Sequence, residues 1–115
     1  MTFVRWWTRR GSARRMTRSD CVASSDLIAL GAIRALRRAG MSVPGDVSVV
    51  GYDDMLLARL STPALTTIRQ DFASLGALIM QKVLIAMEEP DNVTESTPLP
   101  TSLIVRGSTR RLERP

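Results

Sequence analysis

Apolar residues recur at helical spacing in two stretches of this chain, and each stretch is bounded by residues that begin or end helices. The first stretch predicts a helix over residues 26–39, with Gly40 as the left-handed residue that follows it. The residues on its apolar face are Ala29, Ile33 and Leu36. Arginines fill much of the remaining surface of this helix, so we expect one buried and one solvated side.

The second stretch predicts a longer helix over residues 72–88, between Asp71 as the capping residue and Pro90 as the stop. Four apolar residues fall on one stripe of this helix, and the stripe is expected to be buried. They are Leu75, Ile79, Val83 and Ala86.

Short runs of apolar and β-branched residues between these helices predict strands. The clearest is 47–51, whose composition is typical of a strand covered on both faces. We also predict strands at 21–23, 65–69 and 103–105, the last at a sheet edge, and a short helix over 55–60. Strands that alternate with helices favour an α/β fold with a partial, mostly parallel sheet, flanking helices and right-handed connections.

The positive charge of the chain is concentrated at its beginning. The net charge is +5, and residues 1–20 hold six arginines and one aspartate, which leaves the rest neutral. We expect residues 1–19 to be a basic, disordered leader and residues 110–115 to be a basic tail. The alternative is that this arm, with Trp6 and Trp7, binds nucleic acid or a membrane surface.

Other features place the chain among cytoplasmic proteins. It has one cysteine, no signal-peptide pattern, and no apolar run of the roughly 20 residues that cross a bilayer. It also lacks histidine, a nucleophile motif, a metal-ligand cluster and a phosphate-binding glycine loop. We therefore expect no enzymatic activity, no cofactor, no metal and no membrane contact. Asp53 and Asp54 could form an acid–base pair, but adjacent residues rarely aim both carboxylates at one substrate.

Polar and aromatic residues follow three of the predicted strands, as Ser24-Ser25-Asp26, Tyr52-Asp53-Asp54 and Gln70-Asp71-Phe72. The carboxyl ends of parallel strands meet at one edge of a sheet, where ligands bind in folds of this class. Carboxylates, an amide and a ring suit a polyhydroxylated molecule. The alternatives are structural: Ser25 and Asp71 as helix caps, the aspartates in turns, and Phe72 as a packing residue.

Four segments resemble the LacI/GalR family of transcriptional regulators in order and spacing. They are residues 22–32, 43–54, 62–72 and 99–109. The resemblance covers about residues 20–109. It implies the C-terminal subdomain of a periplasmic-binding-protein-like (type I) fold, in which two α/β subdomains close around a sugar, nucleoside or similar effector. In such regulators a separate helix-turn-helix headpiece binds operator DNA.

The resemblance also implies roles for individual residues at the effector site. Asp53 would accept hydrogen bonds from ligand hydroxyls, Gln70 would add polar recognition, and Phe72 would stack on the ligand. Ser25 stands where many relatives have asparagine, so its contact with the ligand would be shorter.

Four further residues resemble positions on the dimer face of the family, namely Leu30, Arg34, Leu60 and Ser61. Core packing remains open for the two leucines. The implied function is a truncated regulator with an effector-binding and dimerisation module and no headpiece, able to form a homodimer or a heterodimer with a full-length relative. Because one wall of the cleft is present, we expect weak or no effector binding and no operator binding by the chain alone.

Overall fold

The computed structural model describes residues 19–91 and 95–111, which form a four-stranded sheet with three helices. Every predicted helix and strand is present, with bounds within two residues of those expected. In chain order they are β1 (Ser19–Val22), α2 (Asp26–Arg38), β2 (Val47–Tyr52), α3 (Leu56–Leu60), β3 (Thr66–Gln70), α4 (Phe72–Glu88) and β4 (Thr101–Ile104). Residues 1–18 of the predicted leader lie outside the described residues, and Ser19 belongs to β1; of the predicted tail, residues 110 and 111 are described.

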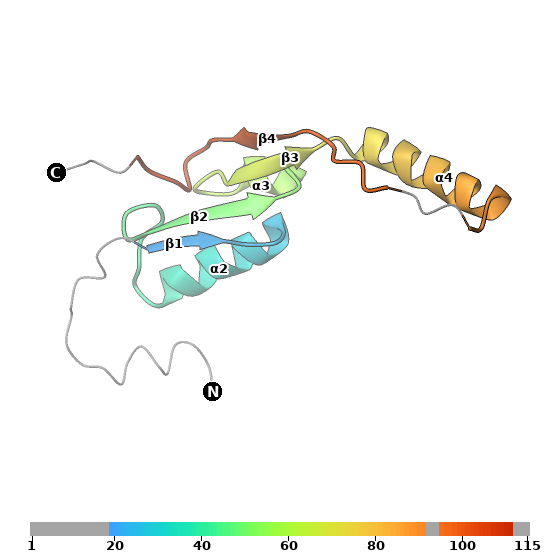
Figure 1. Ribbon diagram of the computed structural model, residues 1–115. Helices are drawn as coiled ribbons and strands as arrows, with labels where there is room; N and C mark the ends of the chain where they lie inside the picture. The colour runs from blue at the N-terminus through green and yellow to red at the C-terminus, as the bar shows by residue number, and fades with distance from the viewer. Residues whose placement is uncertain (1–18, 92–94, 112–115) are drawn as a thin grey trace, which may run out of the picture.

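The strands follow one another across the sheet in the order β1-β2-β3-β4 (Figure 1). β1 is parallel to β2 and β2 is parallel to β3, as the alternation of strands and helices predicted. β4 lies at the edge, as expected, and pairs antiparallel with β3. The segment after β4 then continues alongside the sheet, where Val49 N–H donates to the carbonyl of Ser108 at 2.9 Å.

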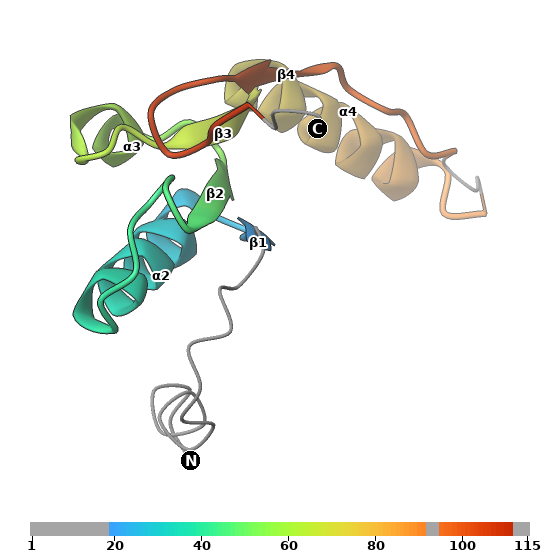
Figure 2. The same cartoon turned by 90° about the vertical axis from the view of Figure 1, so that its left-hand side faces the viewer.

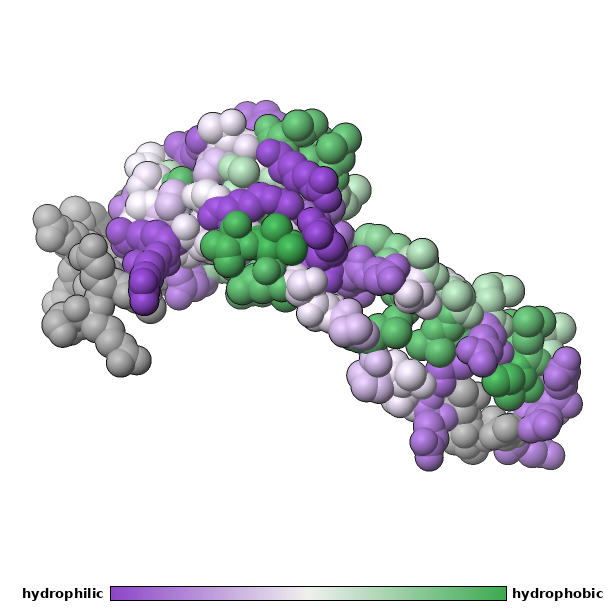
Figure 3. Space-filling view, turned by 90° about the horizontal axis from the view of Figure 1, so that it is seen from above, coloured by the Kyte–Doolittle hydropathy of each residue, from purple (hydrophilic) through white to green (hydrophobic). Residues whose placement is uncertain are grey.

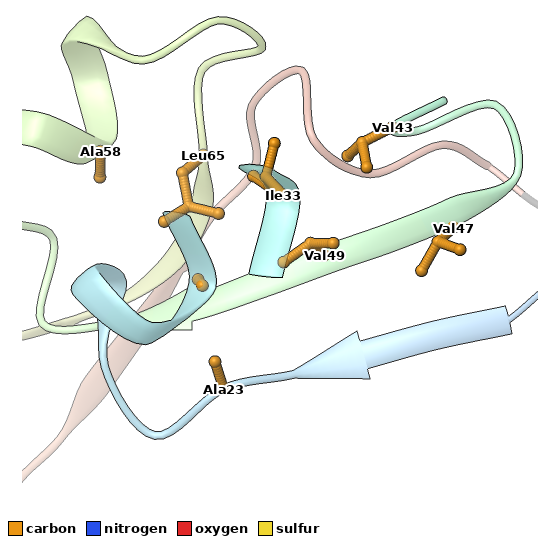
Figure 4. Packing of buried hydrophobic residues seen from close by; sticks show 8 residues of the cluster. Ala23, Ile33, Val43, Val47, Val49, Ala58 and Leu65 are labelled. Atoms are coloured by element: carbon orange, nitrogen blue, oxygen red, sulfur yellow. The ribbon is translucent and has the colours of Figure 1, made fainter. Parts of the chain in front are cut away.

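Both α2 and α3 cover the same face of the sheet (Figure 2). Ala29 and Ile33 of α2 are buried, as the helical spacing predicted, and they pack with Val49 and Leu65 in a small core (Figure 4). Gly40 has a φ of +79° and ends this helical segment in the left-handed conformation. The N-terminal part of α2 lies near the carboxyl end of the sheet, because α2 begins four residues after β1 ends.

The prediction that β2 is covered on both faces was wrong. Its burial alternates along the strand, with Val47 and Val49 buried against the helices and Ser48 and Val50 half-buried on the other side. No helix lies over that second face within the described residues (Figure 2). A β-branched run favours a strand but does not report how many layers cover it.

Helix α4 stands away from the sheet, at the end of an elongated molecule measuring 63 × 31 × 30 Å (Figure 1). The predicted buried stripe was wrong, because no residue of α4 is buried, and Ile79 and Val83 are 51% and 44% exposed. The chain leaves the sheet at Gln70 and returns to it at Thr101, and between these points α4 packs extensively against no other described helix or strand. Nowhere in the described ranges is a helix long and apolar enough to span a membrane.

Candidate functional site

The four predicted effector residues all follow or end parallel strands at one edge of the sheet. Ser25 caps α2 after β1, Asp53 follows β2, Gln70 ends β3, and Phe72 begins α4. Because β1, β2 and β3 are mutually parallel, their carboxyl ends share this edge. The edge is therefore the candidate site.

Asp53 and Gln70 are in direct contact. Gln70 Nε2 donates to Asp53 Oδ1 at 2.9 Å, and both side chains are half-buried. The Asp53 backbone N–H donates to the carbonyl of Ile68 at 2.8 Å, which ties the turn to β3. Asp53 Oδ2 accepts no hydrogen bond from a described residue, so a ligand hydroxyl could reach it.

The backbone at this point is strained, because Asp53 has a φ of 106° and Asp54 a φ of 54°. Positive φ is uncommon outside glycine, and aspartate is among the residues that tolerate it best. The interpretation of these aspartates as turn formers is thus realised, and the turn sends their side chains to different partners. Strain of this kind concentrates at binding sites.

Ser25 and Phe72 lie at the same edge, and among the described residues neither is hydrogen-bonded to Asp53 or Gln70. Ser25 Oγ accepts from the N–H of Ile28 at 3.3 Å, the helix-capping role that was the alternative for this residue. Asp71 likewise caps α4 through the N–H of Ser74 at 3.1 Å. Phe72 is 55% exposed, so it is not a packing residue of the core, and its ring is accessible to a ligand.

Asp54 binds three arginines rather than facing solvent. Its carboxylate is 2% exposed and accepts from Arg106 at 2.5 Å, Arg69 at 2.7 Å and Arg59 at 3.3 Å. Burial would raise the pKa of this carboxyl, but the hydrogen bonds and charges of the arginines prevail and lower its pKa to about 2. Asp54 therefore joins α3, β3 and the segment after β4 behind the candidate site.

Asp26, one of the polar residues after the first strand that were expected at the ligand edge, is instead a second buried carboxylate with internal partners. It is fully buried and accepts from the N–H of Met55 at 2.6 Å and from the hydroxyl of Thr67 at 2.5 Å. A side chain on Gly51 would collide with Asp26 and with Leu65. An acidic residue in the first turn of a helix is normally solvated, so the sequence did not predict the burial of Asp26.

A hollow of about 170 Å³ adjoins the Asp53–Gln70 pair, where α4 and the returning chain leave the sheet. It is lined by Tyr52, Gln70, Asp71, Leu75, Thr97, Leu99, Pro100 and Thr101. Its aromatic, hydroxyl and amide groups are of the kind that hold small polar molecules.

Three of the four predicted dimer-face residues line a second hollow, of about 380 Å³, between α2 and the segment after α3. Its lining comprises Leu30, Ile33, Arg34, Arg37, Arg38, Ser61 and Thr62. Leu60 is not part of this lining. It is 69% exposed on α3, so core packing is excluded for this leucine, whereas Leu30 packs partly against the core.

Metal ligands are not gathered anywhere in the described part of the chain, where no three His, Cys, Asp or Glu side chains are placed to hold an ion. The candidate site therefore consists of hydrogen-bonding groups at one edge of the sheet and the exposed ring of Phe72.

Known proteins share this sequence and fold. Residues 6–109 match the periplasmic binding protein-like domain family. The HTH-type transcriptional regulator MalR of Streptomyces coelicolor is 41% identical over 110 residues, which cover 87% of this chain and 30% of MalR. The chain thus spans less than a third of the length of that relative.

Two solved structures extend the comparison to three dimensions. A LacI family transcriptional regulator from Enterococcus faecium with bound ribose is 32% identical with a TM-score of 0.67, covering 93% of this chain and 38% of that one. The lac repressor dimer bound to operator and an anti-inducer is 34% identical with a TM-score of 0.69, covering 92% and 35%. The family match, the relatives and the shared fold agree: this chain belongs to the periplasmic binding protein-like domain family, in the form that LacI-type transcriptional regulators carry.

Proposed function

We propose that this chain supplies one wall of the effector cleft of a LacI-type regulator, and that the wall binds a sugar or a nucleoside. The observation that carries the proposal is the Asp53–Gln70 pair at the carboxyl edge of the sheet, 2.9 Å apart and half-buried. Asp53 accepts hydrogen bonds from ligand hydroxyls, and Gln70 holds that carboxylate in place while offering its own amide groups.

Two other residues complete the wall. Phe72 presents a half-exposed ring that stacks on the apolar face of a sugar. Ser25 contributes through its hydroxyl proton, because its oxygen accepts the N–H of Ile28. The ribose bound to the relative from Enterococcus faecium supports the choice of a sugar-like ligand.

The same relatives support a proposal for the whole regulator. Operator DNA is bound through a helix-turn-helix headpiece distinct from the described residues, and the wall itself performs no catalysis. Leu30, Arg34, Leu60 and Ser61 form the dimer face, towards a second copy or a full-length relative. The dimeric lac repressor supports this assignment, as do the exposure of Leu60 and the convergence of the other three residues on one hollow. Nothing in the relatives favours nucleic-acid binding through residues 1–19.

Saturation-transfer NMR on the whole chain, with a panel of free sugars and nucleosides, tests the effector wall. We expect weak binding of at least one compound, with a Kd of about 1 mM or above, because one wall buries part of a ligand. Asp53→Asn and Gln70→Ala should each abolish the signal.

Asp20→Asn is the matched control, since it removes one carboxylate near the amino end of β1, at the other end of the strand from the candidate site. The proposal would be contradicted by a signal that survives both site substitutions. It would also be contradicted if no compound gave a signal at about 10 mM, ten times the expected lower limit of the Kd.

A further inference from the structure

Three consecutive backbone N–H groups hold the turn that carries Asp53. The first, of Asp53 itself, donates to a carbonyl of β3. The second, of Asp54, donates to Thr67 Oγ1 at 3.3 Å. The third, of Met55, donates to Asp26 Oδ2 at 2.6 Å. Two of the three acceptors are therefore side-chain oxygens, and they come from β3 and α2.

The two side-chain acceptors are also joined to each other. Thr67 Oγ1 donates its proton to Asp26 Oδ1 at 2.5 Å, and both residues are fully buried. Because a hydroxyl has a single proton, this bond leaves the lone pairs of Oγ1 to accept the Asp54 N–H. The Asp26 carboxylate thus accepts twice, once from the turn and once from the hydroxyl that holds the turn.

The arrangement requires a carboxylate at Asp26, because both of its oxygens face donors. An asparagine of the same shape would turn an NH2 group towards one of them. Facing Met55, that group would set two donors against each other. Facing Thr67, it would leave the hydroxyl proton without its acceptor. The close approach of Asp26 to β2 depends in turn on Gly51, where a Cβ would collide with Asp26 Oδ1.

The turn needs this support because its backbone is in an unfavourable conformation. The positive φ angles of Asp53 and Asp54 persist only where the surrounding contacts determine them. The arginines hold the Asp54 side chain, whereas the direction of the Asp53 side chain depends on the backbone of the turn. Asp26 also directly follows Ser25 at the start of α2, so its bonds set the separation of two residues of the proposed wall.

We propose that Asp26 and Thr67 are positioning residues of the effector wall, which hold the turn in the conformation that presents Asp53 to a ligand. Both are fully buried, so they act through the turn and not by touching the ligand. This inference rests on the proposed function, and it adds two residues that the wall itself does not include.

Amide hydrogen exchange, followed by NMR on the whole chain, tests the positioning without a ligand. Thr67→Val keeps the shape of the side chain and removes its hydroxyl. We expect the Asp54 amide of this variant to exchange at least about tenfold faster relative to the amides in the middle of α2. In Asp26→Asn, the amide of Asp54 or of Met55 should show a similar increase. A general loss of stability speeds all of these amides together and leaves the ratio unchanged.

Ser108→Ala is the matched control, because the Ser108 hydroxyl is also fully buried and makes two hydrogen bonds, neither of them to the turn. This variant and Thr67→Ser, which restores the hydroxyl, should keep the exchange ratio of Asp54 within about twofold. Circular dichroism shows that each variant remains folded. An equal increase in Ser108→Ala, or no increase in Thr67→Val and Asp26→Asn, would overturn the proposal.

Saturation-transfer NMR with ribose, or with a panel compound that binds if ribose does not, measures the consequence for the wall. We expect Thr67→Val to bind at least about fivefold more weakly, and Thr67→Ser and Ser108→Ala to stay within about twofold of the unaltered chain. Faster exchange in Thr67→Val without weaker binding would show that the turn is held for stability alone, which overturns the proposal. If no compound binds the unaltered chain, the effector wall fails, and the exchange ratios still decide whether Asp26 and Thr67 hold the turn.

Discussion

Three aspartates near the carboxyl edge of the sheet have different roles because of the groups around them. Asp26 is buried and accepts from Met55 and Thr67, Asp54 is buried among arginines, and Asp53 keeps one oxygen free. All three follow a strand in the sequence, and that position alone does not distinguish their roles. Asp53 is the one of the three that keeps acceptor capacity for the proposed ligand.

Removing the Asp26 carboxylate should destabilise the fold strongly. Asp26→Ala leaves the Met55 N–H and the Thr67 hydroxyl without their acceptor in a buried place, at a cost of about 2–4 kcal/mol. Equilibrium unfolding in urea measures the loss. Asp20→Ala, at an exposed position, is the control and should cost less than about 0.5 kcal/mol. Equal effects of the two substitutions would refute this role of Asp26.

The Asp54 cluster should make stability depend on acid pH. The pKa of Asp54 is about 2 in the folded chain against an ordinary 3.8, so its contribution is present above pH 3.8 and is lost as the pH falls towards 2. We expect about 1–2 kcal/mol, because two of the three arginines are half-exposed and solvent screens them.

Urea unfolding of the unaltered chain and of Asp54→Asn, measured from neutral pH downwards, checks this dependence. The difference in unfolding free energy should shrink over that interval. A difference that stays constant down to pH 2 would show that the carboxylate charge is not responsible.

At the scale of elements, two helices with similar apolar spacing have opposite environments. α2 packs Ala29 and Ile33 against the sheet, whereas α4 buries no residue. The space-filling view shows apolar and polar side chains intermixed on the part of the molecule that projects from the sheet (Figure 3). Spacing thus predicts a helix and its apolar face, but the connection to the sheet decides whether that face is covered.

The same substitution in the two helices should therefore have different costs. Ile33→Ala removes a side chain that is 5% exposed and should cost about 2–4 kcal/mol. Ile79→Ala removes one that is 51% exposed and should cost less than about 1 kcal/mol. Urea unfolding provides both values. A loss of stability from Ile79→Ala as large as that from Ile33→Ala would mean that α4 packs against the sheet and its helices in solution.

The segment after β4 should be an integral part of the sheet. Ser108 is fully buried, and its hydroxyl accepts from Thr66 N–H at 2.8 Å and donates to the Val49 carbonyl at 2.6 Å. Ser108→Ala loses the hydrogen bond to Val49 of β2 and the hydrogen bond from Thr66 of β3. The loss should lower the free energy of unfolding by about 1–3 kcal/mol in thermal or urea unfolding. Ser102→Ala, on exposed β4, should change stability little. An equally mild effect at Ser108 would contradict this role.

At the scale of the whole molecule, the described residues supply one wall of the proposed cleft. The chain covers 30% of MalR and 38% of the ribose-bound structure, and binding in a closed cleft buries most of a ligand. Calorimetric titration with ribose should therefore give a Kd in the millimolar range or no measurable heat. A micromolar constant would mean that this wall suffices by itself.

The sequence by itself determined the order, type and approximate bounds of the elements, because helical spacing, capping residues and β-branched runs act over a few neighbouring positions. It also placed Asp53 and Gln70 at one edge, since parallel strands align their carboxyl ends. Only the tertiary structure decided that α4 lies apart from the sheet, that β2 is covered on one face, and that Asp26 and Asp54 are buried with partners from distant segments. Those outcomes depend on contacts between residues far apart in the chain, which no local pattern encodes.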